Sequence, residues 1–164
     1  FANGGIYCVP HTILKISDRK GKTVCECKNQ GTRVVKETTA FIVNHLLQEV
    51  VAYGGTGEKA SCDGVKVGGK TGTGSDGNWF VGFTPQYSCA VWHGKELPKN
   101  NAAEIFSRII IGFTNDPEKD FPDCSDIKEA VYCSESGLLI SEKCFRTNIG
   151  YYASDCLPAI CDKH

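Results

Sequence analysis

The residues best suited to chemistry lie in one short segment, residues 64–73, which reads GVKVGGKTGT. This segment fits the pattern G-x-x-x-x-G-K-[ST], a glycine-rich loop that binds phosphates in nucleotide-binding proteins. Such a loop must open a helix, because the backbone amides at the helix N-terminus hold the phosphates. Here Lys70 and Thr71 are followed by a polar turn and then by a strand-like run at 79–83. The context argues against a P-loop nucleotide binder, which stays the least favoured alternative.

The second interpretation places Lys70, Thr71, Gly72 and Thr73, the K-T-G segment, on a β-strand. Alternate residues of a strand share a face, so Lys70 lies with Gly72, and Thr71 with Thr73. On an edge strand, Lys70 offers a positive charge and Gly72 lets a substrate backbone come close. The two threonine hydroxyls and nearby backbone groups suit a carboxylate or an amide. For these four residues alone, a glycine-rich strand built for close packing remains the simpler interpretation.

Several further elements would position the K-T-G segment. Three strand-like runs, residues 65–73, 78–84 and 87–93, are separated by short turns and predict an antiparallel meander. Helical spacing of apolar residues predicts a helix over residues 38–51, capped by Thr38 or Thr39, and a second helix over residues 101–112. An exposed hairpin is expected before the first helix, with its turn at residues 18–21. The fold class is therefore α+β, an antiparallel sheet with packed helices.

Composition narrows the classes of function. The 164 residues carry 18 Lys+Arg against 19 Asp+Glu, a net charge of −1 that speaks against nucleic acid as a partner. The length fits a single folded core, and no apolar run approaches the roughly 20 residues that cross a bilayer. The chain has no methionine, so we expect it to be a piece of a longer protein.

Motifs along the chain, in order, resemble the transpeptidase domain of penicillin-binding proteins of the bifunctional, class A type. The resemblance covers about 110 residues closely and the rest loosely. The residues that carry it are Phe1-Ala2-Asn3-Gly4-Gly5, Glu37-Thr38-Thr39-Ala40, Gly55-Thr56-Gly57, Gly69-Lys70-Thr71-Gly72-Thr73, Asn78-Trp79-Phe80-Val81-Gly82-Phe83-Thr84-Pro85, Ala90-Val91-Trp92, Ser136-Gly137-Leu138-Leu139 with Cys144, and Cys161-Asp162-Lys163-His164.

The resemblance implies part of a penicillin-binding, serine β-lactamase-like fold. It also implies a peptidoglycan D,D-transpeptidase, which cross-links cell-wall stem peptides by acyl transfer and binds β-lactams. In that family Lys70 would sit in the proton and charge network of the nucleophilic serine. Thr71, Gly72 and Thr73 would bind the substrate, and the backbone N–H of Thr73 would form half of the oxyanion hole. No cofactor is implied.

The nucleophile of this family lies in an S-x-x-K element upstream of K-T-G, followed by S-x-N. The chain matches S-x-x-K only at Ser17, in the expected hairpin turn, and at Ser125, after K-T-G in an acidic stretch. Neither position offers a water-excluding site with a base, so we expect no nucleophile in this chain and no activity by the chain alone. Its partners would be the upstream part of the same domain and a stem peptide or β-lactam. The alternative function is that of a non-catalytic binding or scaffold piece of the same fold. Separately, an exposed sheet edge predicts a homodimer.

A boundary near residue 115 is expected between the K-T-G half (1–115) and an irregular cysteine-rich C-terminal extension (116–164). Four cysteines of the extension favour two disulfides; free thiols and a zinc site that includes His164 remain open, and no metal ligand is assigned. The resemblance implies that this soluble chain works at the extracytoplasmic face of the bacterial membrane. The parent protein would be membrane-anchored and carry a glycosyltransferase domain. The four cysteines are Cys133, Cys144, Cys156 and Cys161.

Overall fold

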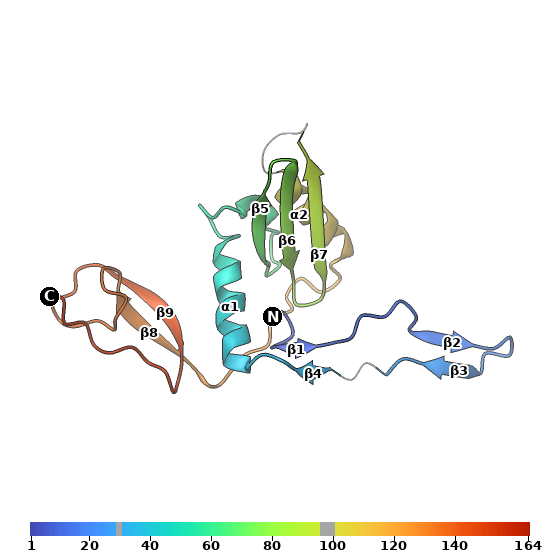
Figure 1. The fold of residues 1–164 in the computed structure, drawn as a ribbon, viewed down its shortest axis with the longest axis horizontal. Coiled ribbons are helices and arrows are strands. Elements are labelled where there is room, and N and C mark those ends of the chain that lie inside the picture. The colour runs from blue at the N-terminus through green and yellow to red at the C-terminus, as the bar shows by residue number, and fades with distance from the viewer. Residues whose placement is uncertain (29–30, 96–100) are drawn as a thin grey trace.

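The computed structural model describes residues 1–28, 31–95 and 101–164. Figure 1 shows a central sheet with a helix behind it, a long two-stranded ribbon that projects to one side, and a hairpin near the C-terminus on the other side. Within the described residues, no helix is both long and apolar enough to cross a membrane.

The central sheet has three strands, β5 (Gly68–Thr73), β6 (Gly77–Phe83) and β7 (Ser88–Gly94), in the order β5-β6-β7. All pairs are antiparallel, which confirms the predicted meander. The first turn is closed by the N–H of Gly74, which donates to the carbonyl of Gly77 at 3.0 Å. The second is closed by the N–H of Thr84, which donates to the carbonyl of Tyr87 at 2.8 Å.

Two α-helices accompany this sheet, α1 (Glu37–Glu49) and α2 (Asn101–Phe113), with a short 3-10 helix η1 (Glu58–Ala60) between them in sequence. Both predicted helices are confirmed within two residues at each end. The predicted threonine cap of α1 is wrong, because the helix already begins after Lys36, which makes no side-chain capping bond. The carboxylate of Glu37 lies in the first turn, where the helix dipole favours negative charge.

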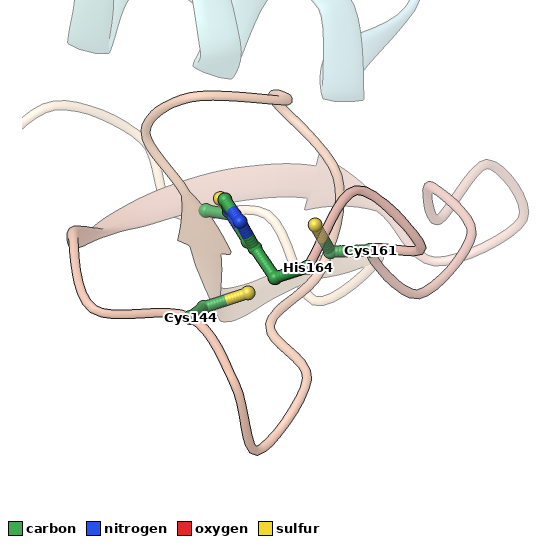
Figure 2. A group of neighbouring side chains, drawn as sticks. Cys144, Cys161 and His164 are labelled. Carbon is green, nitrogen blue, oxygen red and sulfur yellow. The ribbon is translucent and has the colours of Figure 1, made fainter.

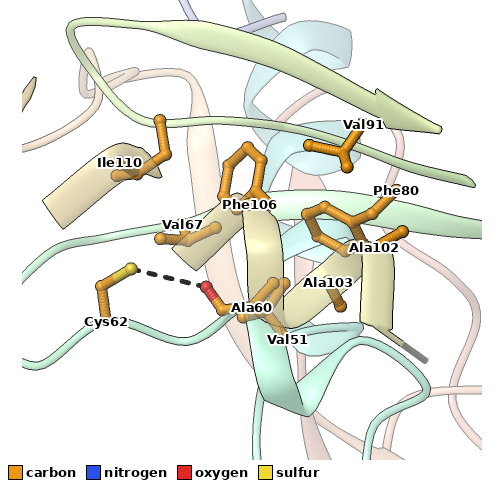
Figure 3. Packing of buried hydrophobic residues seen from close by; sticks show 10 residues of the cluster. All are labelled: Val51, Ala60, Cys62, Val67, Phe80, Val91, Ala102, Ala103, Phe106 and Ile110. Atoms are coloured by element: carbon orange, nitrogen blue, oxygen red, sulfur yellow. Dashed lines mark hydrogen bonds between the residues drawn. The ribbon is translucent and has the colours of Figure 1, made fainter. Parts of the chain in front are cut away.

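The hydrophobic core lies between the sheet and α2 (Figure 3). The rings of Phe80 and Phe106, both without solvent exposure, meet edge to face with centroids 4.8 Å apart. The Cys62 thiol lies in the same core and contacts the carbonyl oxygen of Ala60 at 3.6 Å. The ten buried residues of this core are Val51, Ala60, Cys62, Val67, Phe80, Val91, Ala102, Ala103, Phe106 and Ile110.

Glycines open the space that this aromatic pair fills. Gly69 and Gly82 lie opposite each other on β5 and β6. A Cβ added at Gly69 would lie 2.5 Å from Phe80 Cζ, and one at Gly82 would lie 2.6 Å from Phe80 Cε1. Close packing is therefore one of the functions of the glycines around the K-T-G segment.

Gly69→Ala is expected to lower the free energy of unfolding by about 1–3 kcal/mol, because the methyl group overpacks the Phe80 ring. Urea unfolding of the chain followed by circular dichroism measures this loss. Gly112→Ala is the matched control, since an added Cβ there meets no atom within 4 Å and Gly112 lies in α2. The control should keep or gain stability, by up to about 1 kcal/mol. Equal stability of wild type and Gly69→Ala would contradict the packing argument.

The N-terminal ribbon consists of two short antiparallel pairs, β1 (Ile6–Tyr7) with β4 (Thr32–Arg33) and β2 (Lys15–Ser17) with β3 (Thr23–Glu26). The predicted exposed hairpin is confirmed. Its turn is held by the Asp18 carboxylate, which accepts hydrogen bonds from the N–H groups of Lys20 and Lys22 at 2.8 and 2.9 Å.

The C-terminal extension is more regular than expected. Strands β8 (Ile127–Cys133) and β9 (Thr147–Ala153) pair antiparallel over seven residues each. The Tyr151 ring of β9 packs on α1, with centroid distances of 4.1 Å to His45 and 6.1 Å to Phe41. The hairpin is thereby docked on the helix that precedes the central sheet.

Candidate active-site strand

Strand β5 carries the K-T-G segment at an edge of the described central sheet. The Lys70 ammonium donates to the carbonyl oxygen of Thr71 at 3.0 Å and to Thr71 Oγ1 at 3.2 Å. Thr71 Oγ1 in turn donates to Thr56 Oγ1 at 3.2 Å. A lysine has three donors and no acceptor, so this arrangement holds a positive charge beside two hydroxyl groups. The three side chains form a polar cluster that can bind an anionic or carbonyl-bearing ligand.

The alternation of faces follows the predicted pattern. Lys70 lies opposite Val81 and Gly72 opposite Trp79, whereas Thr71 lies opposite Phe80 of the core. Thr73 is exposed at the end of β5, where it pairs with Asn78. The structure thus joins Lys70 and Thr71 directly, and it places Gly72 and Thr73 further along the same edge strand.

Thr56 is a candidate site residue that the sequence analysis did not select, although it lies in the quoted Gly55-Thr56-Gly57 motif. The N–H of Gly57 donates to the carbonyl of Val50 at 2.8 Å, which folds the loop back on the end of α1. A Cβ at Gly57 would lie 2.9 Å from Phe80 Cε2, so the loop can approach the sheet only with glycine there. The sequence signal that could have indicated Thr56 as a site residue is its position as a polar residue between two glycines.

The sheet face that carries Lys70 and Gly72 is only partly covered. At its Gly68 and Phe83 end, Leu47 of α1 and the Phe121 ring pack against it, and the rest is exposed. Its large exposed apolar side chains are Trp79, Val81 and Trp92, with 47%, 52% and 56% of their surface accessible. Trp79 lies opposite both Gly72 on β5 and Trp92 on β7, so the two indoles flank the centre of this face. Contiguous apolar surface of this kind marks a binding or packing site. We call these three residues the open sheet face.

The P-loop alternative is wrong. Lys70 and Thr71 lie in the middle of β5, and the next element along the chain is β6 after a turn. No helix therefore starts at this segment to offer its amides to phosphates. The match to the phosphate-binding pattern is a coincidence of glycine content.

The two serines that match S-x-x-K lie away from β5. Ser17 ends β2 in the projecting N-terminal ribbon, far from β5 in Figure 1. Ser125 precedes β8 and is exposed, as Ser17 is. Neither serine occupies a site that excludes water, which an activated nucleophile requires.

The ten cysteines are all free thiols, so the two disulfides expected in the C-terminal extension are not formed. Of the four cysteines expected to form them, Cys156 is exposed. The other three, Cys133, Cys144 and Cys161, lie next to His164 and do not form disulfides with one another. Hydrogen bonds, above all with Ser136, lower the pKa of the Cys133 thiol to about 6. By contrast, burial and the nearby Asp63 carboxylate raise the pKa of the core thiol Cys62.

Comparison with known proteins supports the family that the K-T-G segment on β5 indicates. The family model described as the penicillin binding protein transpeptidase domain matches residues 1–110. The chain therefore belongs to the penicillin-binding protein transpeptidase family, as the ordered motifs indicated.

Individual relatives are similar over different lengths. Penicillin-binding protein 1A of Clostridium acetobutylicum is 39% identical over 118 residues, which is 67% of this chain and 15% of the relative. Penicillin-binding protein 1A of Clostridium tetani is 34% identical over 185 aligned residues, which is 100% of this chain and 23% of the relative. The chain thus spans less than a quarter of the length of these relatives.

A solved structure supports the fold. The D,D-transpeptidase domain of a peptidoglycan glycosyltransferase from Eggerthella lenta matches with a TM-score of 0.54 and 26% identity. The match covers 68% of this chain and 30% of that chain. The mixed α and β fold with antiparallel sheets is thus confirmed as a transpeptidase-type fold.

Proposed function

We propose that this chain is the K-T-G part of a peptidoglycan D,D-transpeptidase domain. It forms one side of a site in which a serine from an upstream segment of the same domain is acylated. The acyl donor is the D-Ala-D-Ala end of a cell-wall stem peptide or a β-lactam. The observation that carries the proposal is the cluster of Lys70, Thr71 and Thr56 at the edge of β5 in a chain of this family.

Each residue of the K-T-G segment has a role in this proposal. The Lys70 ammonium stabilises negative charge at the serine and its acyl intermediate. The Thr71 and Thr73 hydroxyls donate to the carboxylate of the substrate or β-lactam, and Gly72 leaves room for its backbone. The backbone N–H of Thr73 provides half of the oxyanion hole, where one donor contributes roughly 2.7–4 kcal/mol to the transition state.

The upstream part of the domain is the proposed cover of the open sheet face. Trp79, Val81 and Trp92 lie on the face of the sheet from which the Lys70 side chain starts, and the Lys70 ammonium lies at the β5 edge against Thr71. A segment that packs on these three residues and reaches this edge comes next to the ammonium group. Such a segment can bring the serine and its base. The chain alone then lacks the nucleophile and is inactive, and residues 1–115 form its part of the domain.

Two further proposals concern the setting of the chain. The parent protein acts at the extracytoplasmic face of the membrane, where peptidoglycan is assembled. In the absence of the upstream segment, the β5 edge pairs with a second copy of the chain. Analytical ultracentrifugation over a range of concentrations distinguishes such a dimer from a monomer. A chain that stays monomeric at high concentration contradicts the dimer proposal.

The test of these roles uses the completed domain, the chain extended upstream along its gene until it includes the S-x-x-K and S-x-N elements. Thr73→Val is expected to slow its acylation by a fluorescent penicillin about ten- to a hundredfold. The physical reason is the lost hydrogen bond to a carboxylate, which contributes about 1.5–3 kcal/mol. Thr23→Val in the exposed β3 is the matched control and should acylate at the wild-type rate. Unchanged acylation of Thr73→Val contradicts its role, and a completed domain that is never acylated favours the scaffold alternative.

A further inference from the structure

Four side chains that bind metals well meet at one end of the C-terminal hairpin. They belong to Cys133, Cys144, Cys161 and His164, here called the cysteine–histidine cluster. Their sulfur and imidazole nitrogen atoms all lie within 4.8 Å of one another. In Figure 2, Cys144 approaches Cys161 and His164, which belong to the last four residues of the chain. The cluster lies apart from β5, so an inference about it is independent of the proposed function.

Backbone hydrogen bonds fix the two buried cysteines side by side. Cys133 ends β8, and its N–H donates to the carbonyl of Leu138 at 2.8 Å across a tight turn. Gly137 makes this turn possible with a φ of 74°. The carbonyl of Leu139 accepts from the N–H of Cys161 at 2.7 Å. The backbone of Leu138 and Leu139 thus binds Cys133 on one side and Cys161 on the other.

Burial in the extension centres on cysteine. Within residues 116–164, all of which the structure describes, the only buried residues are Cys124, Cys133 and Cys161. Large apolar side chains such as Phe145 and Ile160 are exposed, at 95% and 67%. A segment of this size without an apolar core needs a cross-link or a metal to hold one conformation.

A disulfide does not account for the cluster. It would join two sulfurs at about 2.05 Å and leave the third sulfur and the imidazole without a role. A tetrahedral zinc site uses all four, since a Zn–S bond of about 2.3 Å places the ligand atoms about 3.8 Å apart. The distance of 3.4 Å between Cys133 Sγ and His164 Nε2 is of this size.

We propose that the cysteine–histidine cluster is a structural zinc site with three thiolate ligands and one imidazole ligand. Three cysteines and one histidine form a common closed donor set for structural zinc. Thiolate and imidazole ligands also disfavour the hard cations magnesium and calcium, which prefer oxygen. The ion fastens the end of β8 to the last residues of the chain and so closes the extension.

Groups around the cluster already donate to two of the sulfurs. Ser136 Oγ donates to Cys161 Sγ at 3.2 Å, and the N–H of Ser141 donates to Cys144 Sγ at 3.4 Å. Hydrogen bonds of this kind orient metal ligands and stabilise the negative charge of a thiolate. They form an outer shell that suits a bound zinc ion.

The test measures zinc in the 164-residue chain and in the completed domain, both purified under reducing conditions with zinc and freed of excess metal. Mass spectrometry of the metal is expected to give one zinc ion per chain. Cobalt in its place should show a thiolate-to-metal charge-transfer band and the visible bands of a tetrahedral site. X-ray absorption of the wild-type protein should show three sulfur and one nitrogen ligands, at about 2.3 and 2.0–2.1 Å. This last measurement needs no variant and so does not depend on how a variant folds.

Variants locate the ion. Cys144→Ser and Cys161→Ser are expected to weaken zinc binding at least tenfold. Cys156→Ser is the matched control, because this exposed cysteine belongs to the same extension but not to the cluster; it should bind zinc as the wild type does. The proposal is overturned if the chain binds no stoichiometric zinc or if Cys156→Ser loses as much as the cluster variants. A disulfide between two cluster cysteines in the protein purified with zinc also overturns it.

Discussion

Lys70→Ala is expected to slow β-lactam acylation of the completed domain about a hundredfold to a thousandfold. The reason is the loss of a preorganised positive charge at a site where negative charge develops, the kind of contribution that single donors of this strength make. The Lys70 ammonium lies against Thr71, to which it donates two hydrogen bonds. The measurement is the second-order rate constant of labelling by a fluorescent penicillin, followed by gel or by stopped-flow fluorescence.

Lys66→Ala provides the matched control for this prediction. Lys66 lies four positions before Lys70, but its ammonium forms an ion pair with Asp120. Lys66→Ala removes the same type of side chain but leaves the K-T-G segment unchanged. Acylation should therefore stay within about twofold of the wild-type rate. The loss of an exposed ion pair should also change the stability of the domain little. Wild-type acylation of Lys70→Ala, or an equal loss in both variants, would contradict the role given to Lys70.

Phe106→Ala is expected to produce the largest loss of stability, about 3–5 kcal/mol in the free energy of unfolding. Phe106 is fully buried in α2 and meets the Phe80 ring of β6, the strand next to β5. Its removal leaves a cavity next to Gly69 and Gly82, which lie opposite each other on β5 and β6. Urea unfolding of the chain gives the change, and a total stability of roughly 5–15 kcal/mol makes it a large share.

Phe113→Ala is the matched control for the core prediction. Phe113 is the last residue of the same helix and is 67% exposed. Its removal should change stability by no more than about 0.5 kcal/mol, as at most surface positions. If Phe106→Ala and Phe113→Ala unfold at the same urea concentration, the Phe106 ring does not contribute to the stability of the core.

Much of the central sheet could be predicted from the sequence, because its signals are local. Strands of two-residue period separated by glycine and proline turns specify an antiparallel meander, and β5, β6 and β7 follow it closely. The faces of the K-T-G segment follow from the same period. Thr56 could not be assigned to the site in this way, because its contact with Thr71 depends on how the loop after α1 folds back.

The C-terminal extension shows where such reasoning fails. Its composition predicts little regular structure, yet β8 and β9 pair along their whole length. Cys133 and Cys144 lie far apart in sequence from Cys161, and only the hairpin and the Leu139 backbone contacts bring these sulfurs together. Sequence spacing alone therefore left disulfides, free thiols and zinc as alternatives.

The most direct test of the central claim is the intact mass of the 164-residue chain after incubation with a β-lactam, compared with that of the completed domain. The mass of the chain alone is expected to stay unchanged, and the completed domain is expected to carry one β-lactam as a covalent adduct. An adduct on the chain alone would contradict the central claim, because the nucleophile would then lie within these residues, and peptide mapping would show whether Ser17 or Ser125 carries the acyl group.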